Sequence, residues 1–195
     1  MIKRLFDVIL SFVAIIILIP VFIIVSVLIK IDSSGPVFFL QERVGLNGKI
    51  FKIIKFRSMK INQDVSLTIT IGNDKRITKI GKYLRRYKID EIPELINVFI
   101  GNMSFVGPRP DVPGYADLLT GESRNILKLR PGITSRASIK YANEEMILLT
   151  QDDPIAYNNN IIFPDKVKLN LNYYYNNNIW IDIKIIFATL FTVLK

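Results

Sequence analysis

The stretch "VILSFVAIIILIPVFIIVSVLI", Val8 to Ile29, contains no charged residue and consists almost wholly of Val, Ile, Leu, Phe and Ala. An apolar run of about 20 residues is long enough to cross a bilayer as a helix. A cleavable signal peptide is disfavoured, because the run is long and no small-residue cleavage site follows it. The segment therefore belongs in a membrane, and the rest of the chain has to be interpreted around it.

Two features of this segment bear on its topology. Pro20 lies near its middle, where a proline removes a main-chain hydrogen bond and kinks or breaks a helix at a cost of roughly 3 kcal/mol. Lys3 and Arg4 precede the run and Lys30 follows it, whereas positive charge is typical of the cytoplasmic side of a membrane segment. A helix broken at Pro20 that enters and leaves by the same face satisfies both observations. A kinked single-pass anchor is the equal alternative.

Composition limits the kind of protein and the chemistry available to it. The 195 residues suffice for one domain, and half of them are hydrophobic. Lys and Arg outnumber Asp and Glu by 26 to 17, so the net charge of +9 favours a membrane surface or phosphate-bearing ligands as partners. The apolar content and the lack of an interleaved aromatic and basic patch argue against nucleic acid. Without Cys or His, thiolate nucleophiles, imidazole bases and Cys/His metal sites are excluded.

Several elements can be predicted beyond the apolar run. After a loop at Asp32 to Pro36, "VFFLQERV" and "IFKIIKFRSM" flank "GLNGK", a pattern typical of a β-hairpin. Polar residues from Asn62 to Asp74 predict a surface loop, and Ile77 to Tyr87 predicts a basic helix. The end of the chain, "IWIDIKIIFATLFTVLK", fits a core helix or a helix lying in the membrane interface equally well.

The stretch "YKIDEIPE", Tyr87 to Glu94, places two adjacent carboxylates before a proline. Apolar residues recur at helical spacing from there to Phe99, and a proline is tolerated only in the first turn of a helix. We therefore predict a helix that begins near Asp90 and stops at Gly101. Asp90 and Glu91 then lie at its N-terminus, where the helix dipole favours negative charge by about 0.3–1 kcal/mol. Capping is the structural alternative to a catalytic role.

A second short motif, "GNMSFVGPRP", holds Arg109 between Pro108 and Pro110. The two prolines leave the main chain little freedom. A rigidly held arginine suits the presentation of a planar guanidinium to a phosphate. A surface arginine in a tight turn is the alternative interpretation.

Four motifs in order resemble one family over nearly the whole chain. "SSGPVFFLQERVGLNGKIFKIIKFRSM", "RITKIGKYLRRY", "YKIDEIPELINVFIGNMSFVGPRP" and "LKLRPGIT" are similar to the bacterial sugar transferases known as monotopic phosphoglycosyl transferases, in their short form. The resemblance implies a helix-dominated α+β fold with a small β-hairpin and amphipathic interfacial helices. It implies a re-entrant membrane helix at 1–31, broken at Pro20, and a cytoplasmic catalytic domain at 32–195 with a C-terminal interfacial helix.

The implied reaction moves sugar-1-phosphate from a UDP-sugar to a polyprenyl phosphate, usually undecaprenyl phosphate, and releases UMP. This is a first membrane step of surface glycan synthesis, at the inner leaflet of the bacterial cytoplasmic membrane. By resemblance Asp90 is the nucleophile that forms a covalent phosphosugar intermediate, and Glu91 helps to bind Mg²⁺. Arg85 and Arg109 match the family's phosphate-binding arginines. A homodimer is left open.

The residues themselves are compatible with this chemistry. A carboxylate can attack phosphorus and divide one transfer into two steps. Phosphoryl transfer depends on positioning and on neutralising phosphate charge, which Arg85 and Arg109 would do, with further help from Lys55 and Arg57. Mg²⁺ takes oxygen ligands, and one or two carboxylates with substrate phosphates suffice.

A catalytically silent, membrane-anchored scaffold of the same fold is the alternative function. The chain also departs from the family at the segment "SRASIKYANEE", Ser135 to Glu145, so the identity of the sugar is not carried over. Glu94 stands where the family often has Gln, and Asn170 stands where some relatives have Asp. Arg136 and Lys140 are candidates to replace a missing basic group.

Overall fold

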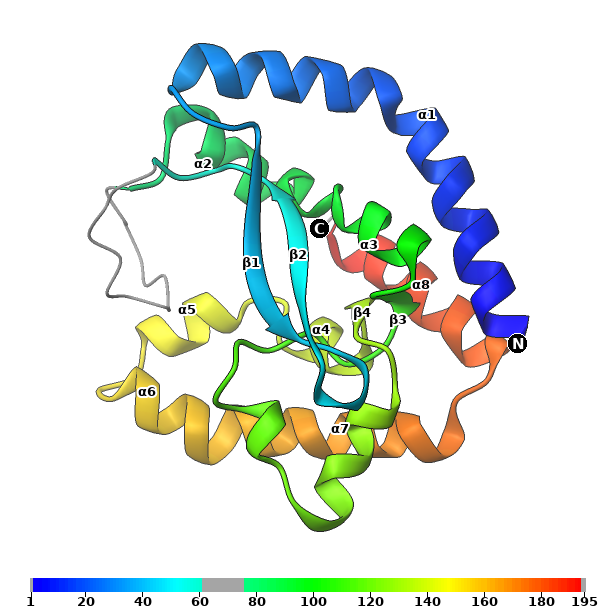
Figure 1. Ribbon diagram of the computed structural model, residues 1–195. Coiled ribbons are helices and arrows are strands. Elements are labelled where there is room, and N and C mark those ends of the chain that lie inside the picture. Colours follow the sequence, from blue (N-terminus) through cyan, green and yellow to red (C-terminus); the bar gives the residue numbers. More distant parts are fainter. Residues whose placement is uncertain (1, 61–75, 194–195) are drawn as a thin grey trace.

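The computed structural model describes residues 2–60 and 76–193. Its longest element is helix α1 (Ile2–Asp32), which runs along one side of the molecule in Figure 1. A hairpin of β1 (Phe38–Val44) and β2 (Ile50–Phe56) crosses the centre, and α7 (Phe163–Asn176) and α8 (Ile179–Val193) close the fold. The predicted helix-dominated α+β fold is confirmed. The surface loop predicted at 62–74 lies outside the described residues.

Helix α1 continues through Pro20, so the predicted break at this residue is instead a bend within one helix. Figure 1 shows the two halves of α1 running in different directions. Proline removes one main-chain donor and crowds the preceding turn, which a bend can accommodate without ending the helix. Both halves of α1 contact the rest of the protein, the N-terminal half at α3 and the C-terminal half at the hairpin.

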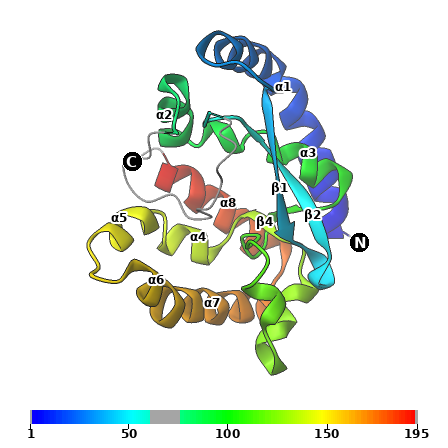
Figure 2. The ribbon, with the colours of Figure 1, turned by 60° about the vertical axis from the view of Figure 1, so that its left-hand side comes forward.

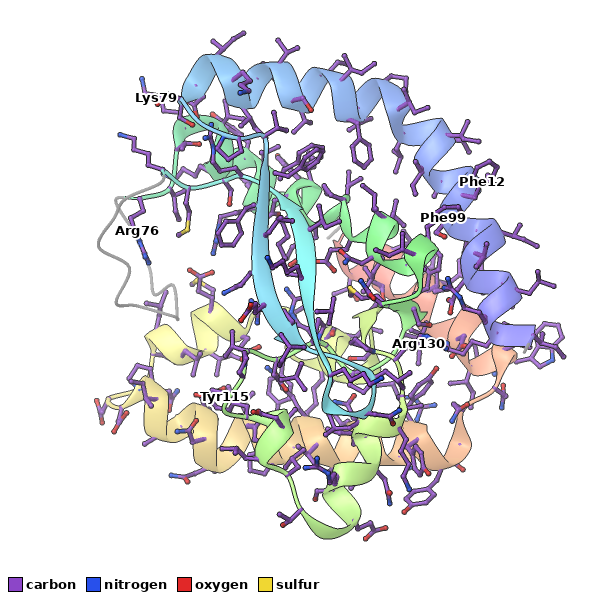
Figure 3. All side chains as sticks on the ribbon, viewed as in Figure 1. Phe12, Arg76, Lys79, Phe99, Tyr115 and Arg130 are labelled. Carbon is purple, nitrogen blue, oxygen red and sulfur yellow. The ribbon has the colours of Figure 1, made fainter. Side chains whose placement is uncertain are left out.

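The N-terminal end of α1 is tied down by charged side chains. Lys3 pairs with Asp182 of α8 at 2.6 Å. Arg4 donates to two main-chain carbonyls in the last turn of α3 (Glu94–Ile100), at 2.6 and 2.8 Å. Asp7, which is fully buried, accepts hydrogen bonds from the Ser104 hydroxyl and from the main-chain N–H of Phe105. One turn further on, Phe12 stacks on a ring of α3 (Figure 3).

The C-terminal end of α1 is tied to the hairpin. Arg57, which directly follows β2, donates to the carbonyls of Ser33 and Ser34 at 2.6 Å each. Ile29 packs in a buried cluster with Phe56 of β2 and Leu84 of α2 (Lys79–Arg86). Both ends of α1 are therefore fixed to one globular unit, and they cannot move apart independently of it.

Between these anchors α1 presents an apolar surface to its surroundings. Among the described residues it is the one helix long and apolar enough to cross a membrane. Its exposed side chains could not remain in water without a large cost in free energy. They include Ile9, Phe12, Val13, Ile16, Ile17, Ile19, Ile23, Ile24, Val27 and Leu28.

The predicted hairpin is confirmed as an antiparallel pair in which Phe38 faces Phe56 and Val44 faces Ile50. The short turn η1 (Leu46–Gly48) joins its strands. A second, parallel pair is formed by β3 (Ser104–Val106) and β4 (Gly132–Thr134).

Short helices complete the chain. Turns η3 (Ala116–Leu118) and η4 (Gly121–Lys128) precede β4, and three helices follow it: α4 (Arg136–Lys140), α5 (Glu144–Leu149) and α6 (Pro154–Tyr157). A π-helical segment, η5 (Asn158–Ile162), leads into α7. The view turned by 60° in Figure 2 agrees with Figure 1 that α7 lies at the opposite end of the molecule from the C-terminal half of α1.

The helix predicted to begin near Asp90 begins four residues later. Asp90 belongs to the 3₁₀ turn η2 (Ile89–Glu91), and α3 starts at Glu94 with Pro93 at its N-cap. Pro93 has no N–H to donate, so the preceding turn closes through tighter i to i−3 bonds, from Glu91 to Lys88 and from Ile92 to Ile89. No side chain caps α3, so the capping role considered for the two acids is wrong. The predicted stop is confirmed, since Gly101 adopts the left-handed conformation with φ 97°.

Candidate active site

A cavity of about 640 Å³ opens between the hairpin, α2, η2 and the helices α5 and α7. Its charged lining is dominated by cations, which suits a ligand bearing several phosphates. Five acids line it: Asp90, Glu91, Asp111, Glu144 and Glu145. Nine cations do: Arg43, Lys55, Arg57, Lys60, Arg76, Arg85, Lys88, Arg109 and Lys166.

Asp90 is a buried carboxylate of this wall with an oxygen that accepts no hydrogen bond within the described part of the chain. Its side chain is buried at 8% exposure, and Oδ1 has no hydrogen-bond partner among the described residues. Burial raises the pKa of Asp90, and the charge of Glu91 adds to this, while Lys55 and Arg85 oppose it. An unpaired carboxylate that lines a cavity of this size and charge is available for nucleophilic attack.

Glu91, the next residue, is held firmly. Its Oε1 accepts from Lys55 at 2.8 Å and from Arg109 at 2.5 Å. Burial raises the pKa of Glu91, but these two cations outweigh it and hold the pKa well below its usual value. Glu91 is therefore ionised. Its Oε2 has no hydrogen bond within the described part of the chain and can serve as an oxygen ligand.

Glu94 is a third acid at the site, and the sequence did not show its role. It is 2% exposed, and Lys55 lies 3.2 Å from its Oε1. Burial is the main cause that raises the pKa of Glu94, with the charge of Glu91 adding to it against the opposing charge of Lys55. Lys55 thus bridges the 3₁₀ turn and α3, and its charge offsets only part of the cost of burying Glu94, the acid that departs from the family pattern.

Asn97 was missed by the sequence reasoning, although it fixes this arrangement. It is fully buried on α3, where its amide accepts from the Ile54 N–H at 2.9 Å and donates to the Lys52 carbonyl at 2.8 Å. The Asn97 amide thereby forms the two hydrogen bonds to β2 that the main chain of a third strand would form. Because Lys55 is the next residue along β2, this clamp sets its position relative to Glu91. The partners are more than 40 residues apart, so no local pattern predicts them.

The loop that carries Arg109 is packed on both sides of this residue. Pro108 and Pro110 are buried, whereas the Arg109 side chain is 45% exposed and reaches Glu91. The Pro108 carbonyl accepts from the Gly132 N–H at 2.8 Å, which ties the loop to β4. Arg109 therefore extends from a fixed loop into the cavity, as a phosphate-binding arginine must.

Arg85 also lines the cavity, as predicted. It reaches this position because α2 lies directly on the main chain of Ser58, where a Cβ on Gly81 would come within 1.9 Å of the Ser58 carbonyl oxygen. Thr78 caps α2 by accepting from the Gly81 N–H. A glycine at 81 is thus required to bring Arg85 and the strand end together.

Arg57 has a different environment from the one we predicted. It is 3% exposed, and its two terminal nitrogens donate to the chain at Ser33 and Ser34. These contacts favour an anchor for α1 over a phosphate ligand. Arg57 lines the cavity, whereas Arg136 and Lys140 do not: Arg136 donates to Asn172, and Lys140 pairs with Asp165 at 2.7 Å. Asn170 is buried within α7.

The carboxylate oxygens at the site are suited to hold Mg²⁺ together with the phosphates of a bound substrate. No group of three or more potential metal-binding side chains occurs at residues 2–60 or 76–193, so a cage built wholly from protein is absent there. Mg²⁺ bound with a phosphate substrate needs only one or two carboxylates. The unpartnered Oδ1 of Asp90 and Oε2 of Glu91 are suitable oxygens, and Glu91 would be the principal ligand.

Comparisons with known proteins show the family of the chain. The family model described as bacterial sugar transferase matches residues 1–195. The chain is 37% identical to the UDP-glucose:undecaprenyl-phosphate glucose-1-phosphate transferase of Escherichia coli, over 98% of this chain and 40% of that protein. It is 35% identical to the UDP-N-acetylgalactosamine-undecaprenyl-phosphate N-acetylgalactosaminephosphotransferase of Aeromonas hydrophila, over 99% of this chain and 44% of that protein.

A shorter relative matches nearly end to end. The chain is 32% identical to the exopolysaccharide production protein ExoY of Sinorhizobium fredii, over 96% of this chain and 83% of that protein. By contrast, it spans only about two fifths of the length of the two longer relatives.

Proposed function

This chain belongs to the bacterial sugar transferase family, and we propose that it transfers sugar-1-phosphate from a UDP-sugar to a polyprenyl phosphate. One observation carries the proposal. The buried, unpartnered carboxylate of Asp90 faces a cation-rich cavity beside Glu91, which Lys55 and Arg109 hold in place. The names of the longer relatives, which specify undecaprenyl phosphate and UDP-sugars, support the same substrates.

In the first step an Asp90 oxygen attacks the phosphorus that bears the sugar. The bond between this phosphorus and the oxygen bridging to the second phosphate breaks, and UMP leaves with the bonding electrons. An acyl-phosphate joins the phosphosugar to Asp90. UMP is a stable anion at neutral pH, so no general acid is required, and a chain without histidine can carry out the step.

In the second step an oxygen of the polyprenyl phosphate attacks the same phosphorus. The bond to Asp90 breaks, the carboxylate is regenerated, and the product is a polyprenyl diphosphate sugar. Arg109 and Arg85 offset the repulsion between Asp90 and the phosphate oxygens. Mg²⁺, when bound, supplies further positive charge at those oxygens, with Glu91 as its ligand.

The contacts of α1 support a re-entrant membrane segment. A single-pass helix separates its ends by about 30 Å of hydrocarbon, whereas both ends of α1 are fixed to the same globular unit. Lys3, Arg4 and Lys30 flank the apolar run, so both ends are proposed to lie at the cytoplasmic face of the inner membrane. The cavity then opens at the depth where a lipid phosphate lies.

The test is UMP release by the purified full chain in nanodiscs, with Mg²⁺, undecaprenyl phosphate and a panel of UDP-sugars. We expect release with at least one donor and none with Asp90→Asn. After incubation with that donor alone, intact-protein mass should rise by one phosphosugar. Folded, lipid-bound protein that releases no UMP from any donor would contradict the proposal and favour the silent scaffold.

A further inference from the structure

The cavity has two ends of different chemistry, and only one adjoins the membrane helix. At that end Phe38 stacks on Phe56, with ring centroids 5.5 Å apart, and Phe56 packs with Val25 and Ile29 of α1. Phe39 and Met59 extend the same apolar wall. This end suits an isoprenoid chain that arrives from the bilayer.

The other end is polar and lies against α5 and α7, away from the C-terminal half of α1 in both Figure 1 and Figure 2. Both oxygens of Glu144 accept from Lys166, at 2.7 and 2.6 Å, so the carboxylate is held in place while keeping lone pairs free. Tyr115, labelled in Figure 3, makes an edge contact with Phe163 at 5.4 Å between ring centroids. We call Tyr115, Glu144, Asn158, Phe163 and Lys166 the distal end.

A helical irregularity contributes to the distal end. Asn158 begins the π-helical segment η5, which joins α6 to α7. A π turn contains one residue more than an α turn, so it changes which of the following side chains face the cavity. Such segments often occur at functional sites. Here Asn158, the first residue of the segment, and Phe163, the residue that follows it, both line the cavity.

The two-step reaction restricts where the sugar can lie. Displacement at phosphorus proceeds in line, with the entering and leaving oxygens on opposite sides. UMP must leave from the side opposite Asp90, and the lipid phosphate must later enter from that same side. The sugar remains on the phosphorus through both steps, so it needs a third place, outside the path of UMP and lipid.

We propose that the distal end is the sugar subsite, in which Glu144 and Asn158 bind sugar hydroxyls and the Tyr115 ring packs against the sugar. The inference rests on the proposed function, whose in-line steps it uses. Carboxylates and amides satisfy hydroxyl groups, and an aromatic ring covers an apolar sugar face. Glu144 is also close to the phosphate site, because its charge is among those that raise the pKa of Arg109, after that of Glu91.

A binding measurement tests the subsite without turnover. The Asp90→Asn chain in nanodiscs is titrated with UDP, UDP-glucose, UDP-galactose and UDP-N-acetylgalactosamine, and the affinity of each sugar nucleotide is divided by that of UDP. Adding Glu144→Gln should lower the ratio for the preferred sugar by about tenfold or more, with UDP affinity unchanged. Asn158→Ala should act in the same direction, and it removes no contact across the fold, since its amide bonds only the adjacent Asn159.

Asp165→Asn is the matched control. Asp165 lies on α7 next to Lys166 and pairs with Lys140 of α4, but it does not line the cavity. It should leave both affinities unchanged. The proposal is wrong if Glu144→Gln and Asn158→Ala leave the ratio unchanged, or if they weaken UDP as much as the sugar nucleotides, which would indicate a nucleoside site.

The two measurements, UMP release and the affinity ratio, test the transferase proposal and the sugar-subsite proposal separately. If Asp90-dependent UMP release occurs but the ratio does not depend on Glu144, only the subsite is wrong. If no UMP is released but the ratio does depend on Glu144, the subsite stands and the transferase proposal fails. Binding of none of the three sugar nucleotides would contradict both.

Discussion

The ammonium group of Lys55 lies 2.8 Å from Oε1 of Glu91, although the two residues are 36 positions apart. This ion pair joins the central hairpin to the turn that carries the proposed nucleophile. The same ammonium group contacts Glu94, so Lys55 pairs with two carboxylates. Asp90, next to Glu91, has no such partner among the described residues. The adjacent acids Asp90 and Glu91 thus have opposite electrostatic environments. Neutralising them should therefore change the stability of the folded protein in opposite directions.

Asp90→Asn should stabilise the protein while removing its activity. The folded-state pKa of Asp90 is raised, so its favourable contribution exists only at low pH and is lost as pH rises through that pKa. At neutral pH the buried charge is therefore a cost. Thermal unfolding in nanodiscs should show a higher Tm for Asp90→Asn, by roughly 2–4 °C for each kcal/mol regained. A lower Tm would contradict the unpaired environment of this carboxylate.

Glu91→Gln should act in the other direction. The pKa of Glu91 is held well below its usual value by Arg109 and Lys55 against the effect of burial, so its charge stabilises the folded state above the unfolded pKa. We expect a loss of about 2 kcal/mol. The Mg²⁺ concentration for half-maximal activity should also rise by about tenfold or more. Glu94→Gln, which spares both contacts of Glu91, is the control; an unchanged Mg²⁺ titration in Glu91→Gln would exclude the ligand role.

Arg85→Gln should move the acid limb of the first half-reaction to higher pH. Asp90 must be ionised to attack, so the rate falls as pH falls through its pKa, which burial and Glu91 raise and Arg85 partly lowers. Without Arg85 that pKa rises further. The pH profile of the UMP burst with donor alone measures the shift. Arg86→Gln is the matched control, because Arg86 is exposed, stacks on Tyr87 and does not line the cavity; equal shifts in both variants would refute the local effect.

Arg57→Lys separates anchoring from phosphate binding. A lysine cannot reproduce the fork that joins Ser33 and Ser34, so the variant should lose about 1–3 kcal/mol of stability. Its KM for the UDP-sugar should stay close to that of the parent. A large rise in KM with unchanged Tm would show instead that Arg57 serves the substrate.

Trp180, the single tryptophan, reports on helix α8. It is 72% exposed, and Phe187, Leu190 and Phe191 are exposed on the same helix, as in a helix at the membrane interface. In nanodiscs with brominated lipids its fluorescence should be quenched. The double variant Trp180→Phe, Tyr175→Trp moves the probe to α7 and should not be quenched. Unquenched Trp180 would mean that α8 lies away from the lipid.

The sequence predicted those parts that short patterns determine. The hairpin follows from two apolar stretches around Gly45 and Gly48, and the basic helix from the residues before Tyr87. Two short motifs singled out Asp90, Glu91 and Arg109, the resemblance supplied their roles, and the structure pairs Arg109 with Glu91.

What the sequence could not predict depends on contacts between distant residues. In the sequence Asn97 looks like an ordinary polar residue on a short helix. Its role becomes visible only in the fold, where its side chain accepts a hydrogen bond from the Ile54 N–H. Arg57 lines the cavity, but the carbonyls after α1 to which it donates are 23 and 24 residues away, so no local pattern predicts these bonds. The start of α3 was misplaced because the i to i−3 bonding before Pro93 has no distinct sequence pattern.

The pairing of Lys3 with Asp182 also has a consequence for how the protein is made. The two residues are 179 positions apart, so at about 5–20 residues per second Asp182 is synthesised roughly 10–40 s after Lys3. In the first half of that interval the partners of the apolar helix on α3 and β3 do not yet exist, and its partner on α8 is absent throughout. Lipid must therefore hold the nascent helix first, and the folded domain assembles onto a segment already in the bilayer.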